Sequence, residues 1–386
     1  MKNRLVSACG VFILGLLLAL ALVGCGGVSA KPAPTPTPMP TPPGATPTPT
    51  PIPAAHGTFV YVNGSGPGGT QTNGYRLNAD GTLNALAGSP FPVTGGMAVA
   101  GNFLLFASGN NVSSFQIDAA SGGLTKAGSG SLVHAAAVAA DANNVYVAGD
   151  LTPAGSGTGI YGFALASNGA LTPLAGSPYF FEGGCFFCDA PLVLAVNNSF
   201  LIQGGVGFHG VGDFTVYPRG SGGVLAKAQI LGTDAEERVA IQHPTGHFAY
   251  ALNISDGSLT EFSIDASGKP TGGTPIFTNG ADIAVDATGK FLLEVDITGV
   301  VHVFSIDPAS GAFSQIGTSE AAGNGAFGIS MDPSGSFVIV SQSSSSTNLP
   351  GAMNQITVFT FDPATGGMKK LNSFPQAPGQ VVIASR

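Results

Sequence analysis

The hydrophobic pattern is clearest between residues 290 and 335, where four strand-length apolar runs follow one another, at Phe291–Val295, Val300–Ile306, Ala312–Ile316 and Phe327–Met331. Gly, Asp, Pro or Ser separates each run from the next, as in a chain of short β-strands. Two of the breaks, DPASG and DPSG, place Asp at the start of a turn, Pro where a φ of about −65° suits, and Gly where φ must be positive. The stretch predicts a four-stranded antiparallel sheet. A sheet of this size cannot bury both of its faces alone, so it must stack against copies of itself.

The same unit recurs from residue 57 onward with a period of about 45 residues. The turn expected between its third and fourth strands is found seven times, at 77–83, 117–124, 165–171, 217–225, 264–270, 306–313 and 361–368. A short apolar strand expected to line a central channel also recurs seven times, at 97–100, 135–140, 192–196, 238–242, 282–285, 327–331 and 380–385. Because two independent markers give the same count, the sequence predicts an all-β fold, a seven-bladed β-propeller with four antiparallel strands in each blade.

The phase of the repeat predicts how the ring closes. The first complete strand, Thr58–Asn63, matches the second strand of a unit, and the last strand, Val381–Ser385, matches an innermost strand with nothing after it. We therefore expect the C-terminal strand to complete the first blade, which removes an open sheet edge.

Composition narrows the choice of partner. Charged residues make up only 9% of the chain, against about 25% in an ordinary soluble domain. The formal net charge is −8 and no basic stripe occurs, which argues against a nucleic-acid partner. No GxSxG, P-loop, HExxH or EF-hand pattern occurs either, so the sequence gives no support to nucleophilic, nucleotide-dependent or calcium-loop mechanisms. We expect no cofactor and no metal site.

The N-terminal segment has the features of an export signal. Lys2 and Arg4 precede an uncharged apolar run that ends at Gly24. The sequence Leu22-Val23-Gly24-Cys25 resembles the bacterial lipobox, which predicts a signal peptide over 1–24 and lipidation at Cys25. The alternatives are an uncleaved membrane helix, for which the run is about long enough, and an ordinary secreted protein. In the bacterial sorting pattern that this sequence resembles, Gly26 rather than Asp after the cysteine favours the outer membrane.

The segment 25–56 is expected to be a tether. Residues 31–55 contain eleven prolines, mostly alternating with Thr and Ala, a composition that favours an extended polyproline-II spacer and cannot form a core. We therefore expect an extracytoplasmic protein that meets the membrane only through its lipid anchor, with the folded domain at 57–386.

The repeat units resemble those of the lactonase family of seven-bladed propellers. The resemblance rests on FVYVNGSG…TNGYRLNADGTLNALAGSPF, on HFAYALNISDGSLTEFSIDASGKP, and on the HPTG, DATG and DPSG turns, and it covers about 57–386. It implies a YVTN-type, 6-phosphogluconolactonase-like scaffold, in a family whose relatives include muconate-lactonizing enzymes and envelope proteins. The family's name-giving activity is hydrolysis of 6-phosphogluconolactone.

The resemblance also indicates where a lactonase site belongs, at the fourth inner strand in chain order. Active members tend to carry Pro-Arg-His before this strand, an HPNG-type turn after it, and Asn-Glu after the next strand. Here Arg238 and Asn253 are kept, but Val239 stands at the His position and Ile254 at the Glu position. Lactone hydrolysis needs a positive group for the carbonyl and a base or proton donor for water and the leaving oxygen. Arg238 is thus only a weak catalytic candidate.

Binding candidates are expected on the face that carries the loops between second and third strands and between fourth and next innermost strands, at 64–74, 149–159, 175–191, 204–213, 231–238, 317–325 and 342–354. Of the eleven basic residues after Cys25, only Arg238 falls in these loops, which disfavours a phosphorylated sugar. The loop at 175–191 concentrates aromatic residues beside two carboxylates, and it either stacks on a ligand or folds under as a small core. The binding candidates are Arg238, Phe181, Glu182, Asp189, His209 and Glu320.

The remaining cysteines and histidines are expected to be mainly structural. Cys185 and Cys188 lie outside the cytoplasm, so a disulfide is the expected state. His243 and His247 replace turn residues of the repeat, and His302 lies in mid-strand, where we expect it to be packed or half-exposed rather than catalytic. His134 and His209 lie near the candidate face and stay candidates.

Two functions from different classes fit these observations. The first is a binding module that presents its loop face to a glycan, peptide, protein or lactone ligand. The second is a divergent lactonase acting on an unphosphorylated lactone, with Arg238 as the carbonyl or carboxylate clamp. They differ in whether a His, Glu or Asp from elsewhere in the fold converges on Arg238.

Overall fold

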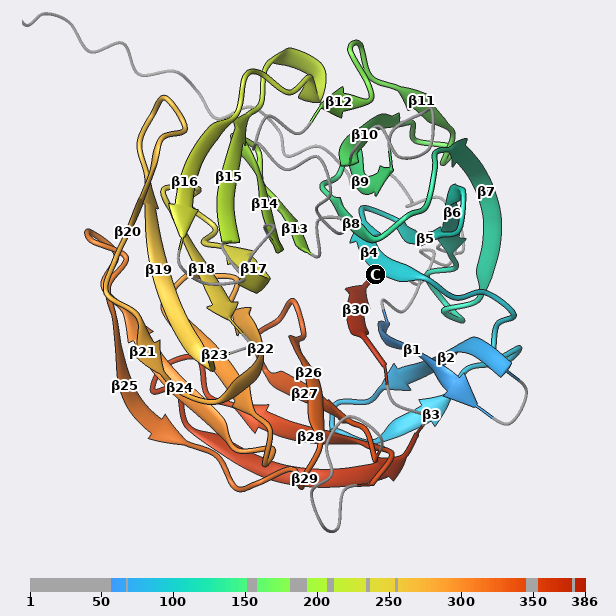
Figure 1. Ribbon diagram of the computed structural model, residues 1–386. Helices are drawn as coiled ribbons and strands as arrows, with labels where there is room; N and C mark the ends of the chain where they lie inside the picture. The colour runs from blue at the N-terminus through green and yellow to red at the C-terminus, as the bar shows by residue number, and fades with distance from the viewer. Residues whose placement is uncertain are drawn as a thin grey trace, which may run out of the picture. The chain divides into compact units, whose positions relative to one another are not determined.

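The computed structural model describes residues 57–66, 69–150, 158–180, 193–206, 212–233, 237–253, 256–344, 353–376 and 379–386. Within 52–386, which form one compact unit, the strands build seven antiparallel sheets arranged around a ring (Figure 1). We number these sheets as blades I to VII in chain order and give the strands of each from the innermost outward. Among the described residues no helix has the length and apolar character needed to span a membrane.

The first four blades contain these strands. Blade I holds β30 (Val381–Ser385), β1 (Thr58–Gly66), β2 (Gly69–Leu77) and β3 (Leu83–Ala85). Blade II holds β4 (Gly96–Ala100), β5 (Phe103–Ser108), β6 (Asn111–Ile117) and β7 (Leu124–Ser131). Blade III holds β8 (Ala137–Ala140), β9 (Asn144–Asp150), β10 (Thr158–Leu165), β11 (Leu171–Pro173) and β12 (Tyr179–Phe180). Blade IV holds β13 (Val193–Val196), β14 (Phe200–Val206), β15 (Gly212–Pro218) and β16 (Gln229–Thr233), with the short 3₁₀ turn η1 (Ser221–Gly223) before β16.

The last three blades follow the same order. Blade V holds β17 (Glu237–Gln242), β18 (Phe248–Asn253), β19 (Ser258–Ile264), β20 (Pro270–Gly272) and β21 (Ile276–Phe277). Blade VI holds β22 (Gly280–Val285), β23 (Phe291–Asp296), β24 (Val301–Ile306) and β25 (Phe313–Thr318). Blade VII holds β26 (Ala326–Met331), β27 (Phe337–Gln342), β28 (Gln355–Phe361) and β29 (Met368–Pro375).

The predicted fold is confirmed, with seven blades of four main strands. Every expected inner strand is the innermost strand of a blade, and every expected marker turn joins a third strand to a fourth. One detail of the prediction is wrong. The first three apolar runs of 290–335 are β23, β24 and β25 of blade VI, whereas the fourth run is β26, the innermost strand of blade VII. The chain crosses from the outer edge of one blade to the axis of the next, so runs that are neighbours in sequence belong to different sheets.

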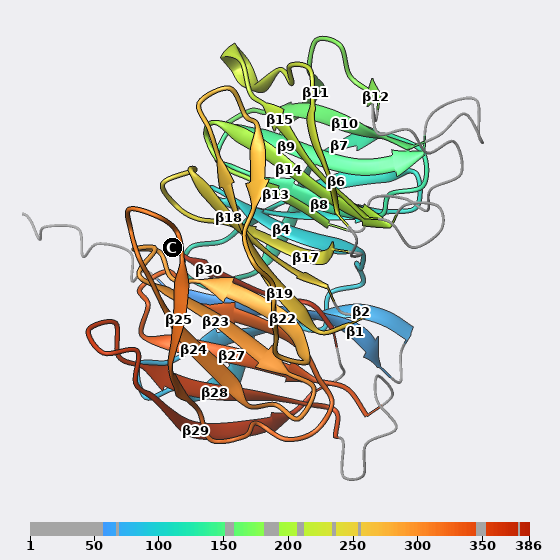
Figure 2. The ribbon, with the colours of Figure 1, turned by 60° about the vertical axis from the view of Figure 1, so that its left-hand side comes forward.

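The ring closes as predicted. β30 pairs antiparallel with β1, from Thr58 opposite Ser385 to Val62 opposite Val381. Figures 1 and 2 show this C-terminal strand beside the N-terminal strand of blade I. Each innermost strand also contacts the next one around the ring, including β26 with β30 and β30 with β4. No blade edge facing the axis is left without a neighbour.

The core lies between blades rather than at the centre of the molecule. The buried hydrophobic side chains of the described residues form seven clusters, and each cluster joins two neighbouring blades. Between blades IV and V, for example, the rings of Phe214 and Phe262 stack with their centroids 3.9 Å apart. Each sheet therefore buries both faces by stacking, because side chains alternate between the two faces of a strand.

Candidate functional site

One face of the ring carries the starts of the innermost strands and the ends of the second strands. We call it the loop face, since it also carries the loops between second and third strands. Three consecutive innermost strands begin there with a β-bulge, between Glu237 and Val239, Gly280 and Asp282, and Ala326 and Gly328. A bulged residue has no ladder partner and its side chain is re-aimed. In blade VII this residue is Phe327, whose side chain is 50% exposed.

The bulge of blade V places Arg238 at the loop face. Its neighbour Glu237 pairs with Asn253 at the end of β18, so the two family positions kept in this chain lie on adjacent strands. Asn253 is buried. The side chains of Arg238 and Val239, and all of Ile254, lie outside the described residues. Whether an acid converges on the Arg238 guanidinium therefore stays a prediction.

A group of ionisable side chains lies in the next blade, at the same level. Glu294 and Asp296 are alternate residues of β23, and His302 on β24 is the cross-strand partner of Glu294. The three side chains therefore lie on one face of the sheet, the face packed toward blade V, because Leu292 of the same face packs there with Tyr250. The His302 Nε2 lies 3.2 Å from the Asp296 Oδ2, and its Nδ1 lies 3.1 Å from the Gln315 Nε2. We call Glu294, Asp296 and His302 the blade VI cluster.

The cluster combines a histidine and an aspartate with opposite pKa shifts. The hydrogen bond to Asp296 raises the pKa of His302, with burial acting against it. Burial tends to raise the pKa of Asp296, but hydrogen bonds from His302, Thr298 and Val300 outweigh it and lower the value. Each partner thus favours the charged form of the other, as expected for a half-buried ion pair.

Glu294 is the unsatisfied member of the cluster. Its side chain is fully buried, and neither carboxyl oxygen has a hydrogen-bond partner in the described structure. Burial raises its pKa to about 8, and the nearby His302 lowers it only in part. The Thr278 hydroxyl also lowers it slightly, but by geometry this hydroxyl donates to the Gly257 carbonyl at 3.3 Å. Glu294 is therefore largely a neutral acid at pH 7.

Asp282 is a second acid at the loop-face end of blade VI. It occupies the ladder position after the bulge that Val239 occupies in blade V. Its carboxylate accepts hydrogen bonds from the backbone N–H of Ile329 in blade VII at 2.8 Å and of Ile283 at 2.9 Å. Burial raises its pKa to about 7, against these two bonds. Because the carboxylate contacts β26, it is directed away from blade V and the segment of Arg238.

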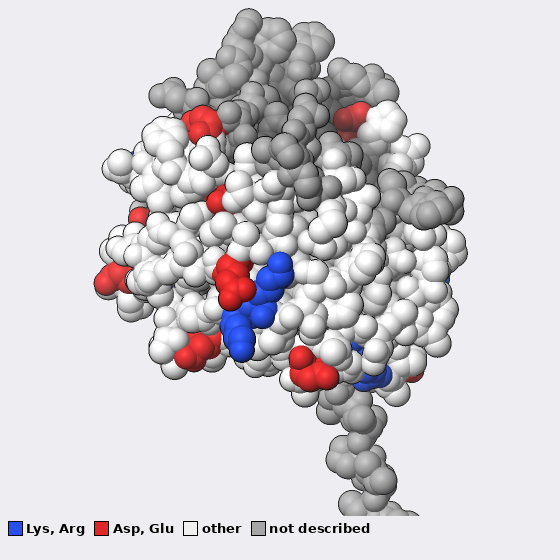
Figure 3. Space-filling model, turned by 90° about the horizontal axis from the view of Figure 1, so that it is seen from below, with Lys and Arg blue, Asp and Glu red and all other residues white. Residues whose placement is uncertain are grey.

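Positive charge is scarce around this site. Among the described side chains, the ends of the strands at the loop face carry Asn, Gln, Thr, Ser, His, Asp and Glu but no arginine. Arg76 and Arg219 lie on the opposite face instead. Arg76 contacts the Ala120 carbonyl in a third-to-fourth turn, and Arg219 pairs with Asp141 in the turn between β8 and β9. Figure 3 shows how few charges the ring carries on the side seen there. Lys370, on the outer strand β29, reaches the carbonyls of Ala321 and Ala322 at 3.1 and 3.2 Å.

The other predicted residues fare differently. Phe181, Glu182, Asp189 and His209, together with Cys25, Cys185 and Cys188, lie outside the described residues. Glu320 is exposed, and its backbone carbonyl accepts a hydrogen bond from the Ser319 hydroxyl at 2.8 Å. His134 lies at the loop face and pairs with Asp150 at 2.6 Å.

Two predictions about histidines are confirmed. His243 is a buried turn residue whose ring contacts the Thr245 hydroxyl and the Gly289 carbonyl, each at 2.8 Å. His302 is half-buried, as expected from its place in mid-strand. Its partnership with Glu294 and Asp296 was not foreseen. The signal was a glutamate inside the apolar run FLLEVD, where an ordinary propeller strand has a hydrophobic residue.

Comparison with known proteins agrees with this architecture. The family model "Lactonase, 7-bladed beta-propeller" matches residues 249–385. A putative 6-phosphogluconolactonase from Bacteroides fragilis shares 17% identity over 87% of this chain and 100% of its own, with a TM-score of 0.66. A putative 6-phosphogluconolactonase from Bacteroides uniformis shares 18% identity over 85% of this chain and 99% of its own, with a TM-score of 0.67. The periplasmic gluconolactonase of Pseudomonas aeruginosa shares 17% identity over 85% of this chain and 99% of its own, with a TM-score of 0.63. No curated protein matches the sequence.

Proposed function

From the premise that this chain is a lactonase-type seven-bladed propeller, we propose that it is a cell-envelope binding protein whose loop face takes an uncharged, polyhydroxylated ligand. The observation that carries the proposal is the absence of arginine from the described side chains of the loop face, where amides, hydroxyls and carboxylates predominate. Amide and carboxylate groups hydrogen-bond sugar hydroxyls, whereas a phosphate normally meets several cationic side chains or backbone N–H groups. The formal net charge of −8 also disfavours an anionic ligand such as a sugar phosphate.

Binding can be tested with matched ligands. Purified protein is titrated with neutral sugars, neutral sugar lactones and the corresponding sugar phosphates. We expect saturable binding of a neutral member and none of its phosphate ester, because a phosphate normally meets several cationic groups and the loops of this face contain only Arg238. Tighter binding of the phosphate esters would contradict the proposal. The variant Asp265→Asn removes an exposed carboxylate in the turn between β19 and β20, on the opposite face, and serves as a control for unspecific charge effects.

Hydrolysis of an unphosphorylated sugar lactone is the second candidate. The blade VI cluster favours it, since Glu294 supplies a largely neutral acid and His302 and Asp296 supply a polarised imidazole. A structural relative named as a periplasmic gluconolactonase favours it too. Against it stand the burial of Glu294, the orientation of Asp282 toward blade VII, and Val239 and Ile254 at the family's His and Glu positions.

The two candidates separate in one assay. Proton release is followed during incubation with phosphorylated and plain sugar lactones, first with the wild type and then with Arg238→Ala and His302→Asn. General acid–base help contributes typically ~10²–10⁴-fold in rate, so we expect rates near background for the phosphorylated lactone. Turnover of plain lactones that Arg238→Ala abolishes would establish the second candidate. Turnover of the phosphorylated lactone at about 10 s⁻¹, an ordinary enzyme rate, would contradict the binding role.

The location of this activity is also a proposal. The sequence Leu22–Cys25 and the proline-rich segment 31–55 support export and lipid anchoring, with the propeller held outside the cytoplasm on an extended tether. A glycan, peptide or protein of the envelope would then be within reach of the loop face.

A further inference from the structure

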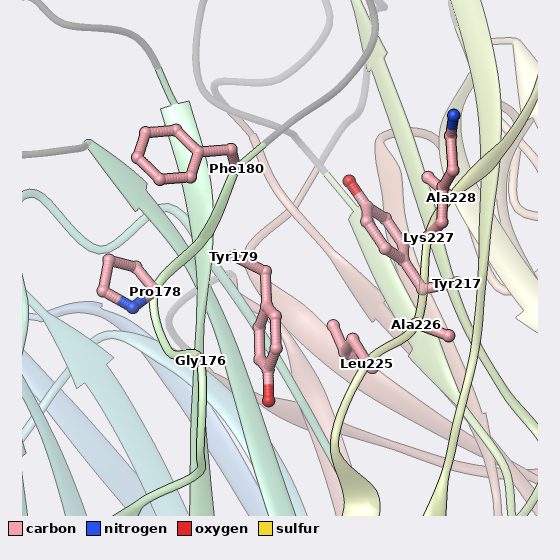
Figure 4. Close-up of a pocket in the computed structure, with 9 residues that line it drawn as sticks. All are labelled: Gly176, Pro178, Tyr179, Phe180, Tyr217, Leu225, Ala226, Lys227 and Ala228. Carbon is pink, nitrogen blue, oxygen red and sulfur yellow. The ribbon is translucent and has the colours of Figure 1, made fainter.

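A pocket of about 340 Å³ lies between blades III and IV (Figure 4). Blade III contributes the corner between β11 and β12, with Gly176, Pro178, Tyr179 and Phe180. Blade IV contributes Tyr217 of β15 and the segment Leu225–Ala228 that leads into β16. These outer segments are interrupted or irregular, whereas β7, β25 and β29 run as continuous outer strands. Both sides of the pocket are therefore formed by segments that depart from the regular outer strand.

Three aromatic residues, Tyr179, Phe180 and Tyr217, line this pocket. Tyr179 packs into the hydrophobic cluster that joins blades III and IV, together with Tyr217 and Leu225. Its hydroxyl donates to the Ala175 carbonyl at 2.9 Å, and the Tyr217 hydroxyl donates to Gln203 Oε1 at 3.2 Å. These bonds hold both rings in place. Phe180 is 69% exposed, an unusual position for a phenylalanine, and Figure 4 shows its ring turned away from Tyr179 and Tyr217.

One cation lines the pocket. Lys227 lines the pocket from the side of blade IV and is exposed. In the described part of the chain no carboxylate pairs with it. In a protein with a formal net charge of −8, an ammonium without a carboxylate partner among the described residues is a local site of opposite charge. Pockets that bind small ligands are commonly lined by aromatic side chains with a few polar groups that fix orientation, and their volumes begin at about 300 Å³.

We propose that this pocket binds the ring of an acidic sugar, with the partly exposed ring of Tyr179 against its C–H face and Lys227 on its carboxylate. The volume suits a single six-membered ring with its substituents rather than an oligosaccharide. A sugar ring stacks one apolar face on a flat aromatic surface while its hydroxyls stay hydrated at the open mouth. The ammonium of Lys227 provides three donors to a carboxylate, as a charge-assisted pair. The uronate class has both features in one molecule.

This site is separate from the loop-face site. Its residues come from blades III and IV, at the start of the 175–191 loop and in the segment before β16, while Arg238 and the other bulge positions lie at the starts of innermost strands in blades V to VII. An acidic sugar held here would fix the propeller on an anionic glycan while leaving the loop face free for its own ligand. The two proposals can therefore fail independently.

The test is a titration of the whole folded protein with glucuronate, followed by calorimetry or by saturation-transfer NMR at low salt. We expect saturable binding that weakens as salt is raised, and no measurable binding of glucose at the same concentrations. Lys227→Gln should weaken binding about tenfold, as expected when a charge-assisted hydrogen bond is lost. Tyr179→Leu should weaken it several-fold because the stacking ring is lost, and a melting curve of the variant checks that this partly exposed position tolerates the change.

Controls make each outcome decisive. Lys269→Gln removes an exposed lysine in the turn between β19 and β20 and should leave glucuronate binding unchanged. Benzoate carries the same charge on an aromatic ring. The proposal would be overturned if glucuronate did not bind saturably, or if Lys227→Gln bound it as tightly as the wild type. It would also be overturned if Lys269→Gln lost as much affinity as Lys227→Gln, or if benzoate bound more tightly than glucuronate. Loss of loop-face ligand binding in the Arg238→Ala variant, with glucuronate binding retained, would show that the two sites are distinct.

Discussion

Glu294 stands between Leu293 and Val295 on a strand whose neighbours are buried hydrophobic residues. A carboxyl without a hydrogen-bond partner in such a place costs free energy when it is ionised, because no donor replaces the water it has lost. The fold accommodates it by keeping it largely protonated and by placing His302 opposite. A buried acid that departs from the packing rule in this way is a better candidate for function than a hydrophobic core residue.

The raised pKa of Glu294 gives a pH-dependent prediction. Its pKa is about 8 in the folded protein and 4.5 ordinarily, so between these values the folded state holds more protons than the unfolded state. The free energy of unfolding should therefore fall as pH rises from about 5 to 8. Asp282, with a pKa raised to about 7, and His302, also raised, act in the same direction.

The variant Glu294→Gln should remove most of this dependence, because an amide does not titrate. At pH 8 we expect it to be more stable than the wild type, by on the order of 2–4 kcal/mol from the cost of about 1.4 kcal/mol per pKa unit. At pH 5 the two should be similar. Urea denaturation at the two pH values measures this, with the exposed Glu320→Gln as the control. Equal pH profiles for Glu294→Gln and wild type would contradict the assignment.

At the scale of strands and turns, one contact recurs between neighbouring blades. A tyrosine in the second strand of one blade donates to a glycine carbonyl in the third-to-fourth turn of the next blade. It occurs from Tyr61 to Gly122 at 2.7 Å, from Tyr146 to Gly223 at 2.5 Å and from Tyr250 to Gly311 at 2.8 Å. The tyrosine of the repeat unit and the glycine of the marker turn thus meet across a blade boundary, which gives both a reason to recur.

Loss of one such bond should be measurable. Tyr250→Phe keeps the buried ring but leaves the Gly311 carbonyl without this donor, so we expect a loss of about 1–2 kcal/mol in the free energy of unfolding. The shift of the urea midpoint measures it. Tyr75→Phe removes a hydroxyl that contacts Gln376 on a less buried strand and should cost less. A Tyr250→Phe variant as stable as the wild type would show that the bond contributes nothing net.

The marker glycine has a second constraint besides its conformation. Gly311 has a φ of 76°, and a Cβ there would lie 2.3 Å from the Phe248 ring of blade V. Gly335 has a φ of 71° with open space around it. Both alanine variants pay about 1–2 kcal/mol for the left-handed backbone, but Gly311→Ala should lose a further 1–3 kcal/mol or so for the clash. Urea denaturation of the two variants measures the difference, which is the cost of the clash with Phe248. Equal losses of stability in Gly311→Ala and Gly335→Ala would contradict this cost.

At the scale of the whole molecule, stability depends on ring closure by the last strand. β30 supplies Val381, Ile383 and Ala384 to the clusters that join blade I with blades VII and II. Gln380, just before it, holds the backbone of Met97 in blade II at 2.8 and 3.0 Å. Without this segment β1 would have an exposed edge beside the axis, and the ring would be open between two blades.

Deletion of 380–386 should therefore unfold the domain or leave it aggregating. Removal of residues 1–56 is the matched control, because the described domain begins at Gly57 and this truncation should leave the melting transition unchanged. Differential scanning calorimetry of both truncated proteins tests the prediction. A normal transition after the C-terminal deletion would contradict closure by β30.

Anchoring is a separate prediction at the same scale. If Cys25 is lipidated, Cys25→Ser should release the protein from the membrane fraction or block its processing, because the signal then lacks its modified residue. Fractionation of cells that express each form measures this. Unaltered membrane association would indicate a spanning segment in place of the lipid anchor.

The fold could be derived from the sequence because its governing interaction is periodic. A four-stranded sheet must bury two faces, so the chain repeats its strands and turns, and the repeat reveals blade number, strand order and the phase that closes the ring. The charge-poor composition and the single loop arginine were also plain in the sequence. Arg238 and Asn253, the two positions kept from the family motif, lie on adjacent strands at the loop face.

Only the tertiary structure decided which side chains meet between blades. Tyr179 and Lys227 are far apart in sequence and line one pocket because two irregular outer segments fall beside each other. Glu294, Asp296 and His302 meet because strand register places them on one face of one sheet, and a shift of one residue would have turned Glu294 toward blade VII. Such contacts depend on bulges, register and broken strands, which are local departures from the repeat. Periodicity carries no information about them, and in this protein the candidate chemistry lies where the repeat is broken.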